Sequence, residues 1–198
     1  MASFARVTLE LMSLGASPQL LTAYQSAAAD EIRHAEVAFE IARGYGAEPS
    51  APGRLPLPSM RPAEPERLAL DTFMEGCVAE TIAAVEAGEA ARRAEDSELQ
   101  VRLQVIAEDE ANHAVLAWET LAFLLEIAGP EAGAAIRHRA WVKAPDPDAV
   151  ADALSDDERV RAAHGLLPES LMTFLASRTW HQLILPMLDE LLEDVARA

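Results

Sequence analysis

The segments DEIRH (residues 30–34) and DEANH (residues 109–113) carry the same pattern, Asp-Glu-x-x-His, in two parts of the chain with helical periodicity. Residues three apart lie about one turn apart on one helical face, so each segment can direct a carboxylate and an imidazole toward one point. Core-type residues stand one heptad away from these glutamates and histidines: Tyr24, Ala27, Ala38, Ile41, Leu103 and Ala117. Carboxylates on a buried face are costly unless they are paired or bind metal. The two segments therefore predict inward-facing Glu–His pairs, whose donor atoms suit iron, manganese or zinc.

The hydrophobic pattern around these segments predicts an all-α protein. Six helices are expected, and the last is expected to kink at Pro186. They cover residues 1–14, 18–45, 64–93, 97–127, 131–142 and 169–196. Hydrophobic residues make up 51% of the 198 residues and aromatic residues only 5%, which also favours helices.

A proline-rich linker, residues 46–63, separates the second expected helix from the third. Its five prolines exclude a helix. In an extended form of about 3.1 Å per residue the linker reaches about 55 Å. The helix before it is about 42 Å long at 1.5 Å per residue. The linker therefore predicts a crossover between parallel helices, and the alternative is a surface loop that joins antiparallel ones.

Glu80 supplies a third carboxylate at the level of Glu110. It lies 16 residues before Asp96, and Glu110 lies 14 residues after it, so an antiparallel hairpin places them at nearly the same height. Glu80 shares its helical face with Phe73, Gly76, Cys77, Ala84 and Ala87. Glu75 lies about 140° away around the helix and is assigned to the surface or to a supporting role.

This combination resembles the ferritin-like di-iron carboxylate proteins, in which two helices each give a Glu and two others each give Glu-x-x-His. Bacterioferritins, rubrerythrins and bacterial multicomponent monooxygenases carry this set. The resemblance covers about residues 1–127. It implies a four-helix bundle over residues 1–130 and a C-terminal helical extension over residues 131–198, packed on the bundle.

The resemblance also implies the ligands. Glu31 with His34 and Glu110 with His113 would each hold one metal ion, and Glu80 would be a further ligand or a bridge. The implied metals are two non-haem iron ions, with manganese or a mixed Mn/Fe pair as alternatives.

Three further residues are expected beside the metals. Asp30 and Asp109 resemble aspartates that hydrogen-bond the histidine of the opposite motif and fix its tautomer. Tyr24, one heptad before Glu31, is either a metal-facing, redox-active tyrosine or an ordinary core residue.

The first helix departs from the family's pattern, because the family's first-helix Glu is missing. Its only acidic residue is Glu10, which lies about 16 Å from the level of Glu31 at 1.5 Å per residue. The segments ASFAR (residues 2–6) and EGCVAET (residues 75–81) look like an uncharacterised group of bacterial ferritin-like proteins, in which that Glu falls just upstream of Met1. Either the chain begins late or the site has one carboxylate fewer.

The composition disfavours some classes of binding partner. The net charge of −17 gives no basic footprint for nucleic acid and disfavours an anionic membrane surface. There is no apolar run of membrane-spanning length and no signal peptide is recognised, and Cys77, as the only cysteine, excludes an internal disulfide. We therefore expect a cytoplasmic protein that binds metal ions, with a homodimer over an apolar helical seam as a further expectation.

Three functions are compatible with this reading. The first is an oxidoreductase that activates O2 or peroxide toward a small-molecule substrate, with catalytic residues that the sequence does not identify. The second is a ferroxidase or iron-storage protein, and the third is a non-enzymatic bundle with a degenerate metal site. The remaining aromatic and histidine side chains are assigned to the core (Trp118, Trp141, Trp180) or to the surface and ordinary packing (His138, His164, His181).

Overall fold

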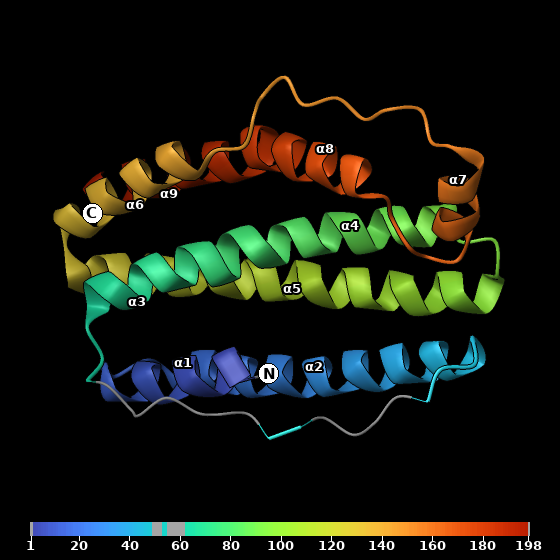
Figure 1. Ribbon diagram of the computed structural model, residues 1–198. Coiled ribbons are helices and arrows are strands. Elements are labelled where there is room, and N and C mark those ends of the chain that lie inside the picture. The colour runs from blue at the N-terminus through green and yellow to red at the C-terminus, as the bar shows by residue number, and fades with distance from the viewer. Residues whose placement is uncertain (1, 49–52, 55–61, 198) are drawn as a thin grey trace. The chain divides into compact units, whose positions relative to one another are not determined.

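The computed structural model describes the chain except for residues 1, 49–52, 55–61 and 198. All regular secondary structure among the described residues is helical, which confirms the all-α prediction (Figure 1). The chain divides into two compact units, Met1–Glu64 and Pro65–Ala198, and each is described by itself. A ferritin-like arrangement of the four long helices and a domain boundary at residue 130 stay predictions, and most of the proline-rich linker lies outside the described residues.

The first unit is a helical hairpin of α1 (Ala2–Ser13) and α2 (Pro18–Gly44). Gly15 turns the chain with a φ of +77°, a conformation that favours glycine. The Ser17 side chain then caps α2 by accepting a hydrogen bond from its first turn, and Pro18 occupies the first helical position. Both helices were predicted within one or two residues of these bounds.

The second unit begins with the elements α3 (Pro65–Asp71), η1 (Thr72–Val78) and α4 (Ala79–Arg93), which follow one another without a break. The sequence predicted one α-helix here, and the structure instead inserts the π-helical segment η1. A short turn leads into α5 (Ser97–Ala128), whose N-terminus is capped by Asp96. Helices α4 and α5 pack along their length (Figure 1).

Glycine 76 sets the distance between η1 and α5. A Cβ atom at Gly76 would lie 2.8 Å from the Cβ of Ala117, closer than real side chains approach. Phe73, on the same segment, meets the ring of Trp118 edge-on with centroids 6.2 Å apart. The core around this contact is fully buried and includes Leu68, Phe73, Cys77, Leu121, Leu124, Leu125 and Ile136.

The C-terminal helices pack on the hairpin of α4 and α5. They are α6 (Pro130–Lys143), α7 (Asp156–Ala163), α8 (Glu169–Thr179), η2 (Trp180–Ile184) and α9 (Leu185–Arg197). Helix α7 was not predicted, although Ser155 and Glu158 form a capping box at its N-terminus, a pattern that the sequence contains. The predicted disturbance at Pro186 takes the form of η2, because proline lacks the N–H that would continue the α-helical pattern.

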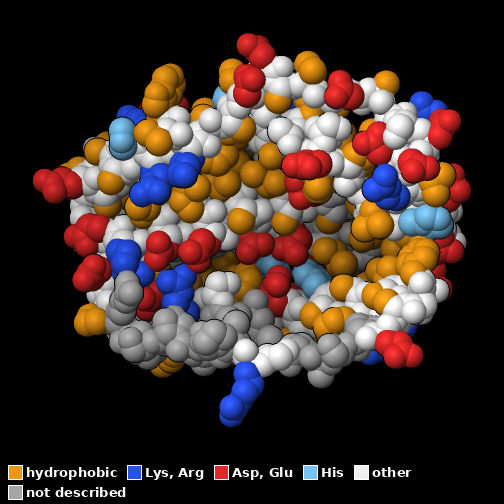
Figure 2. All heavy atoms as spheres, viewed as in Figure 1, with side chains coloured by type: hydrophobic (Ala, Val, Ile, Leu, Met, Phe, Trp, Pro, Cys, Tyr) orange, Lys and Arg blue, Asp and Glu red, His pale blue; other side chains and the backbone are white. Residues whose placement is uncertain are grey.

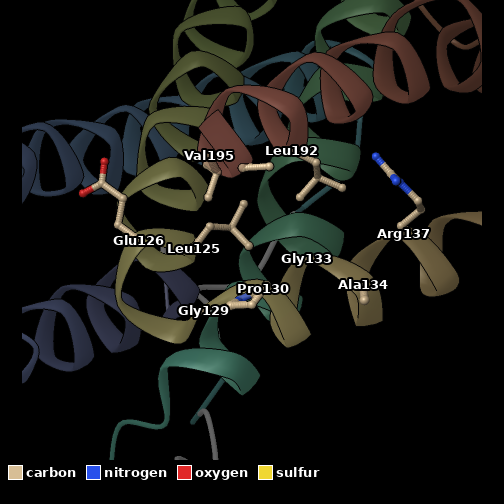
Figure 3. A pocket seen from close by; sticks show the side chains of 10 residues that line it. Leu125, Glu126, Gly129, Pro130, Gly133, Ala134, Arg137, Leu192 and Val195 are labelled. Carbon is tan, nitrogen blue, oxygen red and sulfur yellow. The ribbon is translucent and has the colours of Figure 1, made fainter. Parts of the chain in front are cut away.

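The surface of the second unit carries acidic side chains spread over the C-terminal helices and their connections (Figure 2). A groove of about 700 Å³ opens where α5, α6 and α9 meet, lined mainly by apolar residues (Figure 3). Among the described residues, no helix has the length and apolar character needed to cross a membrane.

Candidate metal centre

Three predicted ligands come together inside the second unit. Glu80 projects from α4, and Glu110 and His113 project from α5; one donor atom of each lies within 4.8 Å of the other two. The residue count across the turn predicted that Glu80 and Glu110 share a height, and the structure places them so. His113 is only 3% exposed and Glu110 is 12% exposed, so the cluster lies largely beneath the surface.

Within the DEANH motif the carboxylate and the imidazole already face each other. His113 Nδ1 lies 3.2 Å from Glu110 Oε2. This contact follows from their spacing, since residues i and i+3 of an α-helix lie on one face. A proton on Nδ1 would be shared with the carboxylate, and Nε2 would remain as a donor atom for a metal ion.

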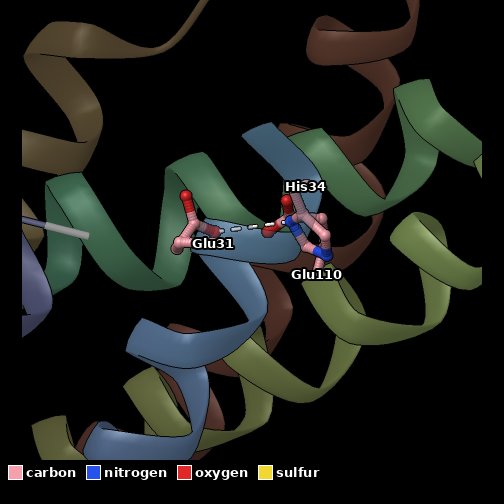
Figure 4. A group of neighbouring side chains, drawn as sticks. All are labelled: Glu31, His34 and Glu110. Atoms are coloured by element: carbon pink, nitrogen blue, oxygen red, sulfur yellow. Dashed lines mark ion pairs between the residues drawn. The ribbon is translucent and has the colours of Figure 1, made fainter. Parts of the chain in front are cut away.

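The DEIRH motif has the same local geometry in the first unit. On α2, His34 Nδ1 lies 3.6 Å from Glu31 Oε1, and the dashed line in Figure 4 marks this ion pair. Glu110, drawn in the same figure, belongs to α5 of the other unit. The side chains of His34 and Glu31 are 12% and 27% exposed. Both motifs therefore form the Glu–His pairs that their spacing predicted.

The spacing of the cluster in the second unit suits a metal ion. Nitrogen and oxygen ligands bind first-row metals at about 2.1 Å, so two ligands on opposite sides of an ion are about 4.2 Å apart. Three ligands of one ion are mutually about 3.0–3.6 Å apart, so donor atoms that now lie within 4.8 Å of one another would move closer by up to about 1–2 Å, which side-chain rotation allows. Two carboxylates and one imidazole also form the mixed oxygen and nitrogen set that iron, manganese and zinc accept.

The turn of helix before Glu80 is small and apolar on its inner side. Cys77 is fully buried, and burial raises the pKa of its thiol well above the ordinary value of 9.0. The thiol is therefore neutral near pH 7 and packs as a small apolar group. Glu75 is exposed, in agreement with its assignment to the surface.

Asp30 and Asp109 were each expected to hydrogen-bond the histidine of the opposite motif. Asp30 forms an ion pair with Arg33 of its own motif. The proposed contacts from Asp30 to His113 and from Asp109 to His34 would join the two units, and they stay predictions.

Two side-chain contacts show how α1 and α2 are aligned in their hairpin. Gln25 donates a hydrogen bond to the Thr8 hydroxyl at 3.3 Å, and the Phe4 and Tyr24 rings are 5.8 Å apart. Thr8 therefore lies opposite Gln25. Counting along the antiparallel hairpin from this pair, Glu10 lies closer to the Gly15 turn than Glu31 does, and the two glutamates differ in height by about 12 Å or more. This agrees with the prediction that Glu10 is too far along the hairpin to join Glu31.

Tyr24 is buried, with 5% of its surface exposed, and packs on Phe4 within the first unit. The sequence allowed two roles for Tyr24, and this packing fits the role of an ordinary core residue. A metal-facing role for Tyr24 stays a prediction.

One aromatic assignment was wrong. Trp118 and Trp180 are buried, but Trp141 is 80% exposed at the end of α6. The buried face of α6 consists of Ala132, Gly133, Ile136 and Ala140. Small residues let α6 pack closely, and the largest apolar side chain of the helix falls outside its buried face. His138 and His164 are exposed, and His181 Nδ1 lies 2.9 Å from the Ser177 carbonyl oxygen, as expected for surface and packing residues.

No protein family, curated protein or solved structure that was compared with this chain matches it significantly.

Proposed function

We propose that this protein binds two metal ions, most simply two iron ions, and uses them as an oxidoreductase that activates O2 or peroxide. The observation that carries the proposal is the meeting of Glu80, Glu110 and His113 within 4.8 Å across the hairpin of α4 and α5. Two half-buried carboxylates beside a buried imidazole repel each other, and a cation or protons can balance that repulsion. A divalent metal ion supplies that charge and fits the donor atoms.

The second half of the proposed site is the Glu31–His34 pair of α2. It repeats the local geometry of Glu110 and His113, which is the strongest reason to assign it the same chemistry. We propose that this pair holds the second ion, with Glu80 as a ligand or bridge. The proposed site is therefore ferritin-like and is built from three helices, which supply three glutamates and two histidines.

The residues of the chain have separable roles in this proposal. The glutamates would hold the ions and balance their positive charge. Each histidine would bind through one ring nitrogen, while a neighbouring group would hold the other nitrogen. Burial of His113 and Cys77 keeps water away from the inner side of the cluster. When bound, reduced metal ions supply the electrons that O2 or peroxide chemistry needs.

The test is anaerobic titration with ferrous iron or manganese, followed by metal analysis of the protein after desalting. We expect about two ions per chain in the wild type. His113→Ala and Glu110→Ala should each remove most of the binding at one position. Glu119→Ala is the matched control, because Glu119 is an exposed glutamate on the same helix and its loss should leave binding unchanged.

Activity is tested by oxygen consumption after reduction of the loaded protein. Consumption that depends on His113 supports the oxidoreductase. Metal binding with mineral formation in a particle of many subunits would instead favour iron storage. The particle mass, measured by light scattering, distinguishes a storage particle from a small oligomer. A wild-type chain that retains no metal would overturn the proposal and leave the non-enzymatic bundle.

A further inference from the structure

Helix α6 has two faces without charged side chains, and only one of them is buried. The buried face consists of Ala132, Gly133, Ile136 and Ala140. The opposite face, which we call the outer face of α6, consists of Ala134, Ala135, His138, Trp141 and Val142, all exposed. At 100° per residue these side chains lie within about 60° of His138 around the helix. Trp141 and Val142 are 80% and 59% exposed, and exposed apolar surface of this kind marks an interaction site.

The residues of the outer face are arranged symmetrically about His138. Ala134 and Ala135 stand four and three residues before it, and Trp141 and Val142 stand three and four residues after it. Two such helices can pack antiparallel around a two-fold axis at His138, and equal sides of the two helices then meet. The second copy's Trp141 would come beside Ala134 and its Val142 beside Ala135, each about 1.5 Å apart in height. The outer face is therefore complementary in shape to a second copy of itself.

The groove beside this face offers a pocket for the tryptophan. Ala134 and Arg137 line the groove of about 700 Å³, opposite Leu192 and Val195 of α9 (Figure 3). Trp141 lies on the same side of α6 as Ala134 and Arg137, at 100° per residue. In the antiparallel pair the second copy's Trp141 would therefore lie over the mouth of this groove. A tryptophan side chain buries about 150–250 Å², so each copy supplies both a large apolar side chain and the groove that can receive it.

The charges around the groove are nearly balanced. Two copies with a net charge of −17 repel each other in general, so a contact between them needs a surface of low charge. Helices α6 and α9 together carry four basic and five acidic side chains, a net charge of only −1. The acidic side chains of α9 that form ion pairs do so with arginines of the same chain: Asp189 with Arg137, and Glu193 and Asp194 with Arg197.

One of these ion pairs stands at the proposed axis. Arg137 lies 3.3 Å from Asp189 and precedes His138 by one residue. The Arg137–Asp189 pairs of two copies would therefore meet on the same side of the axis, where the arginine of each copy can face the aspartate of the other. Glu126 at the edge of the groove does not repel a neutral indole ring. The charges at this surface thus complement those of a second copy.

We propose that the outer face of α6 and the adjoining groove form the contact surface of a homodimer. Its two-fold axis lies at His138, and each copy inserts Trp141 into the groove of the other. A neutral aromatic side chain suits a groove that is lined mainly by apolar residues. This surface differs from the helical seam that the sequence analysis considered for a dimer, and the proposal is independent of the metal site.

The size of the surface predicts a weak dimer. Helix α6 has 14 residues and is about 21 Å long at 1.5 Å per residue. Together with α9 the surface is about two helix diameters wide, which gives about 400 Å² per copy and about 800 Å² in total. Tight dimers bury about 1,200–2,000 Å², so we expect a dissociation constant on the order of 10–100 μM.

Sedimentation velocity of the full chain at about 1–500 μM measures this equilibrium. Trp141→Ala should weaken the dimer by at least about tenfold. The matched control is Tyr45→Ala, because Tyr45 is another aromatic side chain with 60% exposure and lies on α2. The emission of Trp141 should also shift to shorter wavelength as the concentration rises, since Trp118 and Trp180 are already buried.

A cross-link tests the position of the axis. In His138→Cys the two new thiols would face each other at the axis, where closely packed antiparallel helices bring Cα atoms within the about 4.4–6.8 Å that a disulfide needs. Cys77 is buried and does not compete. Mild oxidation should therefore convert His138→Cys to a covalent dimer. Val160→Cys is the control, because Val160 is 59% exposed on α7 and its variant should stay monomeric on a denaturing gel.

A concentration-dependent dimer that requires Trp141 and is captured by His138→Cys supports the proposal. A chain that stays monomeric up to the highest concentration overturns it. It is also overturned if Trp141→Ala associates as the wild type does, or if His138→Cys forms no more covalent dimer than Val160→Cys.

Discussion

Replacing Gly76 by alanine tests the packing that brings Glu80 and Glu110 together. The added Cβ would lie 2.8 Å from the Cβ of Ala117, whereas ordinary contacts begin at 3.4 Å. The segment η1 and helix α5 would have to separate by at least about 0.6 Å, and overpacking of this kind costs about 1–3 kcal/mol. Alanine also gains up to about 1 kcal/mol over glycine from helix propensity. The net change expected from Gly76→Ala is therefore a loss of up to about 2 kcal/mol.

Gly88→Ala is the matched control. Gly88 lies on α4, the helix that continues η1, and its added Cβ would meet only Ala107 Cβ at 3.9 Å, an ordinary contact. Here only the propensity gain acts, so Gly88→Ala should stabilise the protein by about 0.5–1 kcal/mol. Urea denaturation followed by circular dichroism measures both variants. The difference between them isolates the clash, which we expect to be about 1–3 kcal/mol.

A second substitution makes the result specific to the contact. Ala117→Gly removes the atom that the new Cβ would strike, so it should recover part of the stability lost in Gly76→Ala. On its own it should destabilise α5 by about 1 kcal/mol. The two changes should therefore be non-additive. Equal stabilisation by Gly76→Ala and Gly88→Ala, or simple additivity of the pair, would refute this account of the close approach.

The remaining predictions concern the metals, the thiol and a helix cap. Asp109→Ala should weaken metal binding about 10–100-fold in the anaerobic titration, and an unchanged affinity would identify Asp109 as a surface acid. With three glutamates in place of the family's four, one ion should bind more tightly than the other, and two equal, tight sites in the same titration would contradict this. Cys77 should react with a thiol reagent at pH 8 far more slowly in the native protein than in urea, because burial raises its pKa. Since the folded state holds that proton more tightly, the contribution of Cys77 to stability is present below pH 9.0 and is lost as the pH rises further, which urea melts across this range can follow. Hydrogen bonds from Ser155 lower the pKa of Glu158, so Ser155→Ala should raise that pKa toward 4.5 in an NMR titration, and the cap's contribution should disappear as the pH falls through the lowered value.

The sequence by itself determined most of the helices and the local geometry of the two motifs. Helical periodicity and the capping residues Ser17 and Asp96 act within a few residues, so they could be recognised without knowing any tertiary contact. The Glu–His contacts inside each motif follow from the three-residue spacing alone. The level of Glu80 with Glu110 could also be counted, because a short turn fixes the register of an antiparallel hairpin.

Tertiary structure alone decided the π-helical segment and the surface of α6. The segment η1 contains residues that also suit an α-helix, and its contacts with α5 through Gly76 and Phe73 connect residues about forty positions apart. On α6 the buried face is made of Ala132, Gly133, Ile136 and Ala140, so hydrophobicity pointed to Trp141 as a core residue. Trp141 is exposed because the close approach of α6 to its neighbours, where an added Cβ at Gly133 would lie 2.9 Å from Leu192, requires small residues on the packed side. Which face of a helix is covered depends on the shape of the partner surface, and that information is not local in the sequence.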